Sequence, residues 1–534
     1  MLSYRKLAMR VLGRPLHTGR IDSPRPASQR AAAFVLTAAM LITLAAPAFA
    51  KEWYIEDGNI TVKAGDTKGT NKVSQGESTD VPDTDTVITN REKNASSNTV
   101  TIEAKDKDDK VEVTLKDVNI DTSSRNKAAV SVTGEGDTNI KLDGDNALKS
   151  DIYRSGIYGS GSLTISGGEN DSLTAQGGSG ANGISSSGSL TISGGTVTAN
   201  GDDGGRGISS SGSVTISGGS TVTANGGSGT ISGGDGIWSG GGVTISGGST
   251  VTANGGNGGS LVGGDGIRSD GGVTISGGTV KAAGGDSKDG YGGDGIRSGG
   301  GVTISGNTVN AAGGNGGKVG GYGICSFDRV AISGGTVEAA GGNGSTGGGS
   351  GIYSSVIDLS GSLELTAKAG SPNGKALSQK GSELVLDTIK DKLGPGAKVT
   401  ATDADGKVID QVSTPRPVEP EESSSSSDGG SAAPSAPASP LPGLTVTDKD
   451  GQRISYTSTQ SGNTLTVCVG RLTASFRISL AALRQLRAEG IETIAFQTVL
   501  CSTTLSVDEL LAMGGENAEA VLTHRFTDSS LTVG

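Results

Sequence analysis

Aromatic side chains and histidine are scarce in this chain of 534 residues. Phe, Trp and Tyr make up 3% of it, and only two histidines are present. A conventional globular core depends on large apolar side chains, so this composition disfavours such a core over most of the chain. Beyond residue 50 the only histidine is His524, which we interpret as an ordinary strand residue. A Ser-His or Cys-His nucleophile is therefore not expected in residues 98–410.

Cysteine and positive charge are also in short supply. Cys468 and Cys501 could form a disulfide in an oxidising compartment, which would leave Cys325 unpaired. Residues 1–50 hold seven of the 44 basic residues and one of the 55 acidic residues, so the rest of the chain has a net charge of −17. An acidic surface repels nucleic acid and anionic membranes and suits cations or neutral polymers. We expect neither nucleic acid nor a membrane as a partner of the mature chain.

Residues 1–50 are predicted to be a signal peptide. Seven basic residues precede an apolar run from Ala31 to Leu44, and Ala48, Phe49 and Ala50 form a cleavage site of the small-residue type. A membrane anchor is the competing interpretation, but the apolar run is short for a membrane span. We therefore expect a secreted protein that is extracellular or held at the cell surface.

Glycine is abundant, with 93 residues, and much of it belongs to a repeat. Eight copies of a Gly-Ile signature follow one another at intervals of 24 to 30 residues, the length expected for one rung of a solenoid. In the first seven copies a second isoleucine always follows 8 residues later, within "VTIS" or a variant of it. The signature isoleucines are Ile157, Ile184, Ile208, Ile237, Ile267, Ile296, Ile324 and Ile352.

Within each copy the local pattern has a period of two. Val273 and Ile275 point one way and Thr274 points the other, as in a strand with one buried face. Gly-Gly pairs between the strands permit the bends that corners require. Three short strands per rung predict an all-β fold, a parallel β-helix with three sheets and an interior of Ile, Val and Ala. An outer threonine column is also predicted: Thr164, Thr191, Thr215, Thr244, Thr274 and Thr303.

The length variation of the repeat is concentrated at one corner. From the alanine that ends the third strand to the next Gly-Ile signature, the spacing ranges from 9 to 14 residues. Insertions confined to one face of a repeat protein usually mark its working face. Trp238, Tyr291 and Tyr322 lie near this corner and are candidates for contacts with sugar rings, although aromatic packing over glycine is the plainer interpretation.

An acidic column is predicted at the same corner. Asp235, Asp265 and Asp294 stand two residues before the signature isoleucine in three successive copies, so stacking brings their carboxylates together. Calcium could relieve the repulsion, with Asp202 and Asp203 of the preceding corner as further ligands. Arginine could do so as well, because Arg268 and Arg297 each follow an aspartate by three residues. Both alternatives stay open at this point.

The chain divides into five parts by composition. After the signal peptide, 51–97 is predicted to cap the β-helix, which occupies 98–410. Residues 411–443 are rich in Pro, Ser and Glu and are interpreted as a linker. Residues 444–534 are predicted to be a small α+β domain of unknown role, with helices that begin after Ser479 and Ser506.

The motifs "VTLKDVNI", "AAVSVTGEGDTNIKLDG", "SGIYGSGSLTISGG" and "ANGISSSGSLTISGGTVTANGDDGGRGISSSG" resemble a bacterial carbohydrate-binding domain family built on a right-handed parallel β-helix with three sheets. The resemblance covers about 98 to 370. It implies a secreted, non-catalytic binder of plant cell-wall polysaccharides of the cellulose or pectin type, with calcium held by aspartates near the "DGI" corner. By position these are Asp202, Asp203, Asp235, Asp265 and Asp294. Here Gly204, Gly205 and Arg206 separate Asp203 from its Gly-Ile signature, which departs from the pattern.

The leading hypothesis is a polysaccharide-binding rod with Trp238, Tyr291, Tyr322, Arg268 and Arg297 as ligand contacts, and with residues 444–534 as a possible link to the cell wall or surface. A surface adhesin or spacer that binds protein is the first alternative. The second is a pectate-lyase-like enzyme in which Arg268 or Arg297 is the base beside a metal-bound uronate. No catalytic residue is assigned under the leading hypothesis.

Overall fold

The computed structural model describes residues 51–415 and most of 444–533, with gaps at 449–451, 455, 462, 470–472, 499–501, 514–517 and 525–528. The two described parts belong to separate compact units. The predicted signal peptide, most of the predicted linker and Cys501 lie outside the described residues. Of the expected Cys468–Cys501 pair, only Cys468 is therefore described, and its Sγ lies 3.3 Å from Oε1 of Gln497.

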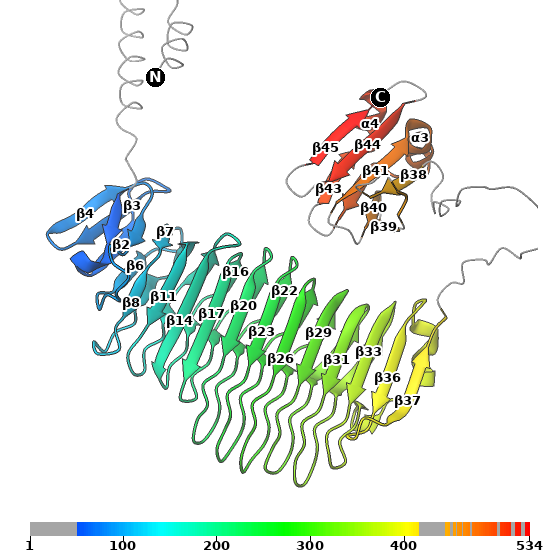
Figure 1. Cartoon of the computed structure of the whole chain (residues 1–534), viewed down its shortest axis with the longest axis horizontal. Coiled ribbons are helices and arrows are strands. Elements are labelled where there is room, and N and C mark those ends of the chain that lie inside the picture. Colours follow the sequence, from blue (N-terminus) through cyan, green and yellow to red (C-terminus); the bar gives the residue numbers. More distant parts are fainter. Residues whose placement is uncertain are drawn as a thin grey trace, which may run out of the picture. The chain divides into compact units, whose positions relative to one another are not determined.

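The first unit is a β-solenoid of stacked rungs, which Figure 1 shows side on. Three strands per rung pair in parallel with the same three strands of the next rung. The predicted parallel β-helix is therefore confirmed. We name the three stacks after their sequences: the GI ladder, the VTIS ladder and the TVTA ladder.

The GI ladder contains the strands that begin with the signature isoleucines, together with the strands stacked before and after them. Its members are β2 (Ile60–Ala64), β6 (Val100–Ala104), β9 (Val130–Gly134), β12 (Ile157–Gly159), β15 (Ile184–Ser186), β18 (Ile208–Ser210), β21 (Ile237–Ser239), β24 (Ile267–Ser269), β27 (Ile296–Ser298), β30 (Ile324–Ile332), β32 (Ile352–Leu359) and β34 (Leu377–Gln379).

The VTIS ladder is the second stack. It contains β1 (Glu52–Tyr54), β5 (Val87–Thr89), β7 (Lys110–Lys116), β10 (Asp137–Asp143), β13 (Ser162–Ser166), β16 (Leu190–Ser193), β19 (Val214–Ser217), β22 (Val243–Ser246), β25 (Val273–Ser276), β28 (Val302–Ile304) and the second halves of β30 and β32. The predicted threonine column lies here, with Thr191, Thr215 and Thr244 in register.

The TVTA ladder is the third stack. It contains β8 (Asn119–Asp121), β11 (Asp145–Lys149), β14 (Ser172–Ser179), β17 (Thr196–Asp202), β20 (Thr221–Asn225), β23 (Thr250–Asn254), β26 (Thr279–Ala283), β29 (Asn307–Ala312), β31 (Gly335–Ala340), β33 (Leu363–Lys368) and β36 (Lys398–Thr402).

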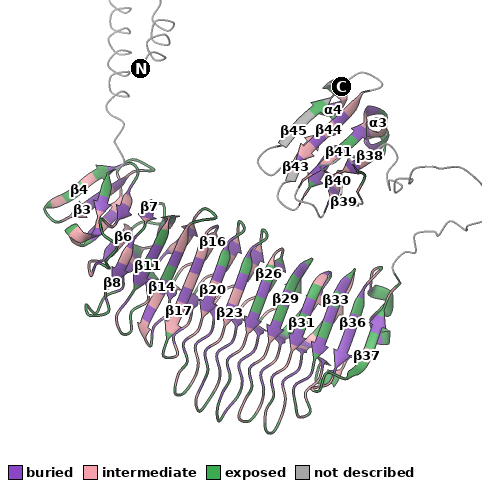
Figure 2. Ribbon diagram, in the orientation of Figure 1, coloured by how far each residue is buried: buried purple, intermediate pink, exposed green. Residues whose placement is uncertain are grey.

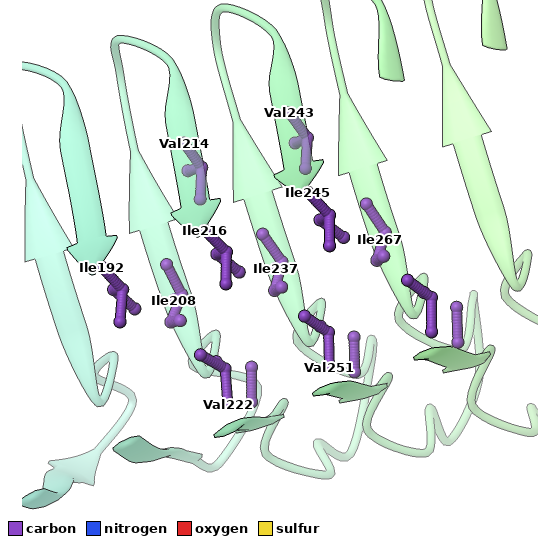
Figure 3. Packing of buried hydrophobic residues seen from close by; sticks show 14 of the residues in the cluster. Ile192, Ile208, Val214, Ile216, Val222, Ile237, Val243, Ile245, Val251 and Ile267 are labelled. Atoms are coloured by element: carbon purple, nitrogen blue, oxygen red, sulfur yellow. The ribbon is translucent and has the colours of Figure 1, made fainter. Parts of the chain in front are cut away.

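The core consists of aliphatic columns inside the three ladders. Figure 3 shows successive isoleucines and valines pointing inward from neighbouring rungs, for example Ile216, Ile237 and Ile245. Burial alternates along each strand, as Figure 2 shows, because every second side chain faces outward. Alanine, valine, isoleucine and leucine fill this narrow interior, which explains how the fold forms with few aromatics.

Both ends of the solenoid are covered by antiparallel structure. At the start, β3 (Asn71–Gln75) pairs with β2 and with β4 (Ser78–Asp83), and η1 (Ile55–Asp57) follows β1. At the other end, β35 (Ser382–Glu383) pairs with β34, η2 (Leu386–Lys392) follows, and β37 (Val408–Ser413) pairs with β36. Such pairing provides hydrogen-bond partners for backbone N–H and C=O groups of the edge strands, which would otherwise be unpaired.

The solenoid extends beyond the range expected from the sequence. β1, β2 and β5 pair in parallel with later rungs, so the ladders begin at Glu52 rather than at residue 98. Within 51–97, β3 and β4 pair in antiparallel fashion at the start of the solenoid, in the segment where a cap was predicted. The predicted end of the solenoid at residue 410 is also too early, because β37 continues to Ser413.

The second unit is α+β, as predicted. Its antiparallel sheet contains β38 (Leu444–Thr447), β41 (Ala474–Ser479), β44 (Glu519–His524) and β45 (Ser529–Val533). Its mixed sheet contains β39 (Thr457–Ser461), β40 (Thr464–Cys468), β42 (Thr493–Gln497) and β43 (Ser502–Ser506). Ser479 caps α3 (Leu480–Ala488) by accepting a hydrogen bond from the Ala482 N–H, and α4 (Val507–Met513) follows Ser506. His524 is a buried strand residue whose Nε2 lies 2.9 Å from Oγ1 of Thr503.

Candidate functional site

Long loops connect the TVTA ladder to the next strand of the GI ladder, at the corner where the repeat length varies. Figure 1 shows them extending beyond the strands on one side of the solenoid. The loops stack in register: Gly229, Gly258, Ser287 and Gly316 form successive parallel bridges. The variable corner therefore forms one continuous surface rather than independent loops.

Each loop has two limbs that lie against each other through glycine backbone. The N–H of Gly256 donates to the carbonyl of Gly234 in the previous loop (2.8 Å), and the N–H of Gly264 donates to the carbonyl of Gly256 in its own loop (2.9 Å). A Cβ atom on Gly264 would lie 1.9 Å from the carbonyl oxygen of Gly234. Glycine is therefore needed at these positions because the two backbones approach too closely for any side chain.

The predicted aspartate column is present at the base of the loops. Asp235, Asp265 and Asp294 are 7%, 6% and 3% exposed, and each accepts a backbone hydrogen bond from the next rung. Oδ1 of Asp235 accepts from the N–H of Asp265 at 2.9 Å, and Oδ1 of Asp265 accepts from the N–H of Asp294 at 2.7 Å. Oδ1 of Asp294 accepts from the N–H of Tyr322 at 2.7 Å. The carboxylates thus tie successive rungs together.

Arginines pair with the two ends of this column. Nε of Arg206 lies 3.2 Å from Oδ2 of Asp235, and Nη1 of Arg297 lies 3.2 Å from Oδ2 of Asp294. The central residue is different: within the described residues, no hydrogen bond or ion pair reaches Oδ2 of Asp265 or the guanidinium of Arg268. Of the two arginines expected beside the column, Arg297 forms the pair and Arg268 does not.

Burial and neighbouring charge act on the acid–base behaviour of the column. Burial raises the pKa of Asp265 well above its usual range, and the charges of Asp294 and Asp235 raise it further. Burial also raises the pKa of Asp294, although the hydrogen bond from Tyr322 and the charge of Arg297 oppose this. Among the described residues, no group of three or more His, Cys, Asp or Glu side chains is arranged to hold a metal ion. Arginine and backbone N–H groups are the neighbours that these carboxylates have here.

Asp202 and Asp203, predicted as further metal ligands, lie apart from the column. Asp202 ends β17, and Oδ2 of Asp203 accepts a hydrogen bond from Oγ of Ser179 at 3.2 Å. Both are exposed. In the rung of Asp202 and Asp203, the position of the aspartate column is occupied by Arg206, which stands two residues before Ile208. The extended acidic strip of five aspartates is therefore not formed.

A groove of about 700 Å³ runs across these rungs. Its lining includes Asp235, Asp265 and Asp294, and also Arg206, Arg268 and Arg297. Tyr291 and Tyr322 line it as well, together with Leu261 and Val262 of the loops. Trp238 is adjacent, since the guanidinium carbon of Arg206 lies 4.3 Å from its ring centroid. The structure thus brings together the ligand contacts predicted from the sequence.

Aromatic side chains gather on this side of the solenoid. Within 98–410 the chain contains seven: Tyr153, Tyr158, Trp238, Tyr291, Tyr322, Phe327 and Tyr353. Tyr158, Trp238 and Tyr353 occupy the outward position after the signature isoleucines, and Tyr322 stacks on Tyr353 with ring centroids 4.9 Å apart. Phe327 lies beside Arg297, at 5.3 Å from its guanidinium carbon. None of the seven is part of the buried core.

Some of these residues were not singled out from the sequence. Arg206 and Tyr353 belong to the site, and their spacing from the signature isoleucines was the available signal. Arg206 precedes Ile208 by two residues, as each aspartate precedes its isoleucine, and Tyr353 directly follows Ile352. Cys325 occupies the outward position between Arg297 and Tyr353, where it is buried and forms no disulfide.

No family model, curated protein or solved structure matches this chain. Within the described residues, no helix is both long and apolar enough to span a bilayer. The solenoid expected from the family resemblance is present, and the family assignment has no further support.

Proposed function

We propose that the outer side of the GI ladder binds a polysaccharide and that the protein does so without catalysis, as a secreted or cell-surface molecule. The supporting observation is the concentration of the aromatic residues of 98–410 on this side. Aromatic rings offer flat apolar faces to the C–H faces of sugar rings, and nearby polar groups bind hydroxyls. The outward positions of the other two ladders hold threonine, serine and asparagine, as in β19 and β20, together with charged residues such as Lys281.

Arg268 is the central polar contact in this proposal. Its guanidinium is half-buried and has no ion-pair partner among the described residues, whereas Arg206 and Arg297 on either side are paired. The charge of Arg268 acts on Asp294, but its guanidinium donors form no hydrogen bond or ion pair among the described residues and are available for a ligand. Arg268 also lies in register between Trp238 and Arg297, so a bound chain that contacts it also passes these residues.

A linear polymer fits the symmetry of the site. Equivalent positions recur at every rung, about 4.8 Å apart, along the solenoid axis. A ligand with its own regular repeat can therefore make similar contacts at successive rungs, as a glycan chain does. Plant cell-wall glycans of the cellulose or pectin type are our candidates. Calcium is a proposed cofactor, and Asp235, Asp265 or Asp294 in the groove lining would supply only part of its ligands, because no three acidic side chains among the described residues are arranged to hold a metal ion.

Affinity electrophoresis of the mature chain through cellulose-derived and pectin-derived polymers tests the proposal, with and without calcium. We expect retention by at least one polymer and about tenfold weaker binding for Arg268→Ala, because charge-assisted hydrogen bonds contribute roughly 1.5–3 kcal/mol. Tyr291→Ala should also weaken binding. Lys281→Ala is the matched control, because Lys281 is an exposed cation of the TVTA ladder without an ion pair in the described structure.

The same experiment separates the alternatives. Retention of no polymer by the wild-type chain would contradict the proposal, and binding to matrix proteins in that case would favour an adhesin or spacer. Release of unsaturated uronides from polygalacturonate would favour a lyase with Arg268 or Arg297 as the base. Binding that is equal in calcium and in chelator would contradict the role of calcium and leave glycan binding in place.

A further inference from the structure

A second pocket lies on the same side of the solenoid, nearer the N-terminus. Its volume is about 580 Å³, and its lining includes Lys127, Tyr153, Arg154, Tyr158 and Ser185. Aromatic side chains are rare in this chain, yet two of them lie exposed in this one pocket: Tyr153 is 77% exposed and Tyr158 is 44% exposed. Two exposed tyrosines in one pocket leave apolar ring faces available for a ligand.

This pocket and the groove lie along the same ladder of strands. Tyr158, Ser185, Ser209, Trp238, Arg268 and Arg297 follow one another in register along the outer face of the GI ladder. Ser185 lines the second pocket, while Gly180 and Asn182 of the same rung line the groove. The Tyr153 ring lies over Gly180, since a Cβ there would be 2.9 Å from Cδ1 of Tyr153. The two pockets therefore meet at one rung.

The backbone of Tyr153 supports a functional interpretation. Its φ is 59°, in the left-handed region that bulky residues rarely adopt. The corner is held there by backbone hydrogen bonds: the Tyr153 N–H donates to the carbonyl of Ser179 at 2.9 Å, and the Arg154 N–H donates to that of Asp151 at 2.9 Å. Conformations of this kind are concentrated at ligand sites because the surrounding structure must maintain them.

The charge of the second pocket is opposite to that of the chain. Its lining contains Lys127 and Arg154 and no Asp or Glu, in a protein with a net charge of −11. Within the described residues Lys127 has no ion pair, and Nε of Arg154 donates to Oδ1 of Asn126 at 3.3 Å. The carboxylate of Asp151, on the same corner, accepts hydrogen bonds from the N–H groups of Asn126 and Ile152. Two cations are thus left for an anionic ligand.

We infer that this pocket is a second subsite, which binds an anionic sugar unit of the same polysaccharide directly through Lys127 and Arg154, with Tyr153 and Tyr158 against the sugar rings. The inference rests on the proposed function. It adds that the ligand carries negative charge, and it specifies the length of ligand that the protein contacts. From Tyr158 to Arg297 the contacts span five rung intervals, about 24 Å. The anionic group is a carboxylate or a sulfate, since both accept the same hydrogen bonds from these cations.

Affinity electrophoresis of the mature chain in chelator tests this inference, with polygalacturonate, dextran sulfate and a soluble neutral cellulose derivative as probes. For the double variant Lys127→Ala/Arg154→Ala we expect about tenfold weaker binding to one or both anionic polymers and unchanged binding to the neutral one. The polymer that loses binding identifies the anionic group. For Tyr158→Ala we expect roughly fivefold weaker binding to every polymer that the wild type binds. Lys281→Ala is again the control.

The outcomes separate the subsite from the proposed function. If Arg268→Ala loses binding while the double variant binds both anionic polymers as the wild type does, the subsite is excluded and the proposed function stands. If the double variant loses binding to the neutral polymer to the same extent, charge recognition is excluded. If the wild-type chain binds no polymer, both fail. The substituted residues are exposed, apart from the half-buried Arg268, and circular dichroism checks that each variant is folded.

Discussion

At the scale of single residues, the aspartate column performs a task that does not require charge. Asn182 accepts a hydrogen bond from the N–H of Arg206 at 2.8 Å, in the same position and geometry as the aspartates. On the other limb of the loops, Oδ1 of Asn257 and Oδ1 of Asn315 accept equivalent bonds from Asp286 and Asn343. An amide therefore suffices to join the rungs. The carboxylates of Asp265 and Asp294 are costly to keep ionised, because burial raises the pKa of both.

Asp265→Asn should stabilise the protein at alkaline pH. The folded-state pKa of Asp265 is raised by burial and by Asp294 and Asp235, so the free energy of unfolding falls as pH rises from the unfolded-state pKa to the folded-state pKa. Above the folded-state pKa this loss of stability is complete, and below the unfolded-state pKa there is no loss. Asparagine keeps Oδ1 and removes this loss, by on the order of 1 kcal/mol.

Urea denaturation of Asp265→Asn and the wild type at pH 8.5 and pH 3.5 provides the measurement. The free energy of unfolding of Asp265→Asn should exceed that of the wild type at pH 8.5 and equal it at pH 3.5. An equal effect at both values would show that charge is not the cause. Thr274→Asn, on the outer face of the VTIS ladder, is a control that should change little at either pH.

At the scale of elements, the loops are held by backbone hydrogen bonds rather than by side chains. Successive glycines in the two limbs donate and accept across a distance that admits no Cβ, while the strands of each rung bury isoleucine, valine and alanine. The two parts of one rung therefore respond to different substitutions. Added volume should disrupt the loops, and lost volume should disrupt the ladders.

Gly293→Ala should destabilise the loops by about 2 kcal/mol or more. A Cβ on Gly293 would lie 1.9 Å from the carbonyl oxygen of Gly264, and overpacking against backbone is not easily relieved. Gly347→Ala, in another loop, is the matched control because its Cβ would meet only the side chain of Val319, at 3.8 Å. Limited proteolysis and thermal unfolding should distinguish the two. Equal stability of both variants would contradict the steric explanation.

Ile275→Ala should lower the free energy of unfolding by about 2–5 kcal/mol, the usual range for truncating a buried isoleucine. Ile275 is fully buried between Ile245 and Ile304 of neighbouring rungs. The neighbouring Thr274 is exposed, and Thr274→Ala should change stability by less than about 0.5 kcal/mol. Guanidinium denaturation compares the pair. A small effect of Ile275→Ala would imply that the rung rearranges to fill the cavity.

At the scale of the whole molecule, the chain contains two cores of different kinds. The solenoid core is a set of aliphatic columns that grows by one layer per rung, and apart from Trp53 in the first strand it contains no aromatic residue. The core of the second unit contains Phe476 and Phe496, with ring centroids 5.3 Å apart, and side chains of both helices. Each core is complete without residues of the other.

A fragment of residues 51–415 should fold alone and keep the polymer binding of the mature chain. Its core contains no residue of 444–533, and its ends are covered by β3, β4 and β37. Circular dichroism and affinity electrophoresis of the fragment and the full mature chain provide the comparison. Binding by the mature chain but not by the folded fragment would assign the glycan site to residues beyond 415.

The sequence by itself determined the rung, the register and the corner that carries the loops. Those properties follow from spacing, because a fixed interval between anchor isoleucines specifies which strands stack, and a period of two specifies which side chains face inward. It also indicated the α+β unit through Ser479 and the leucines of α3. The start of the solenoid was placed too late because the early rungs lack the Gly-Ile signature.

Only the tertiary structure decided how the charged side chains pair. Arg268 and Arg297 have the same spacing from their aspartates, yet only Arg297 forms an ion pair, and Arg206 joins the column from a rung that lacks an aspartate there. Spacing along the chain specifies a column but not the direction of a long side chain within it. That direction depends on neighbours in three rungs at once, and these neighbours become adjacent only when the chain has folded.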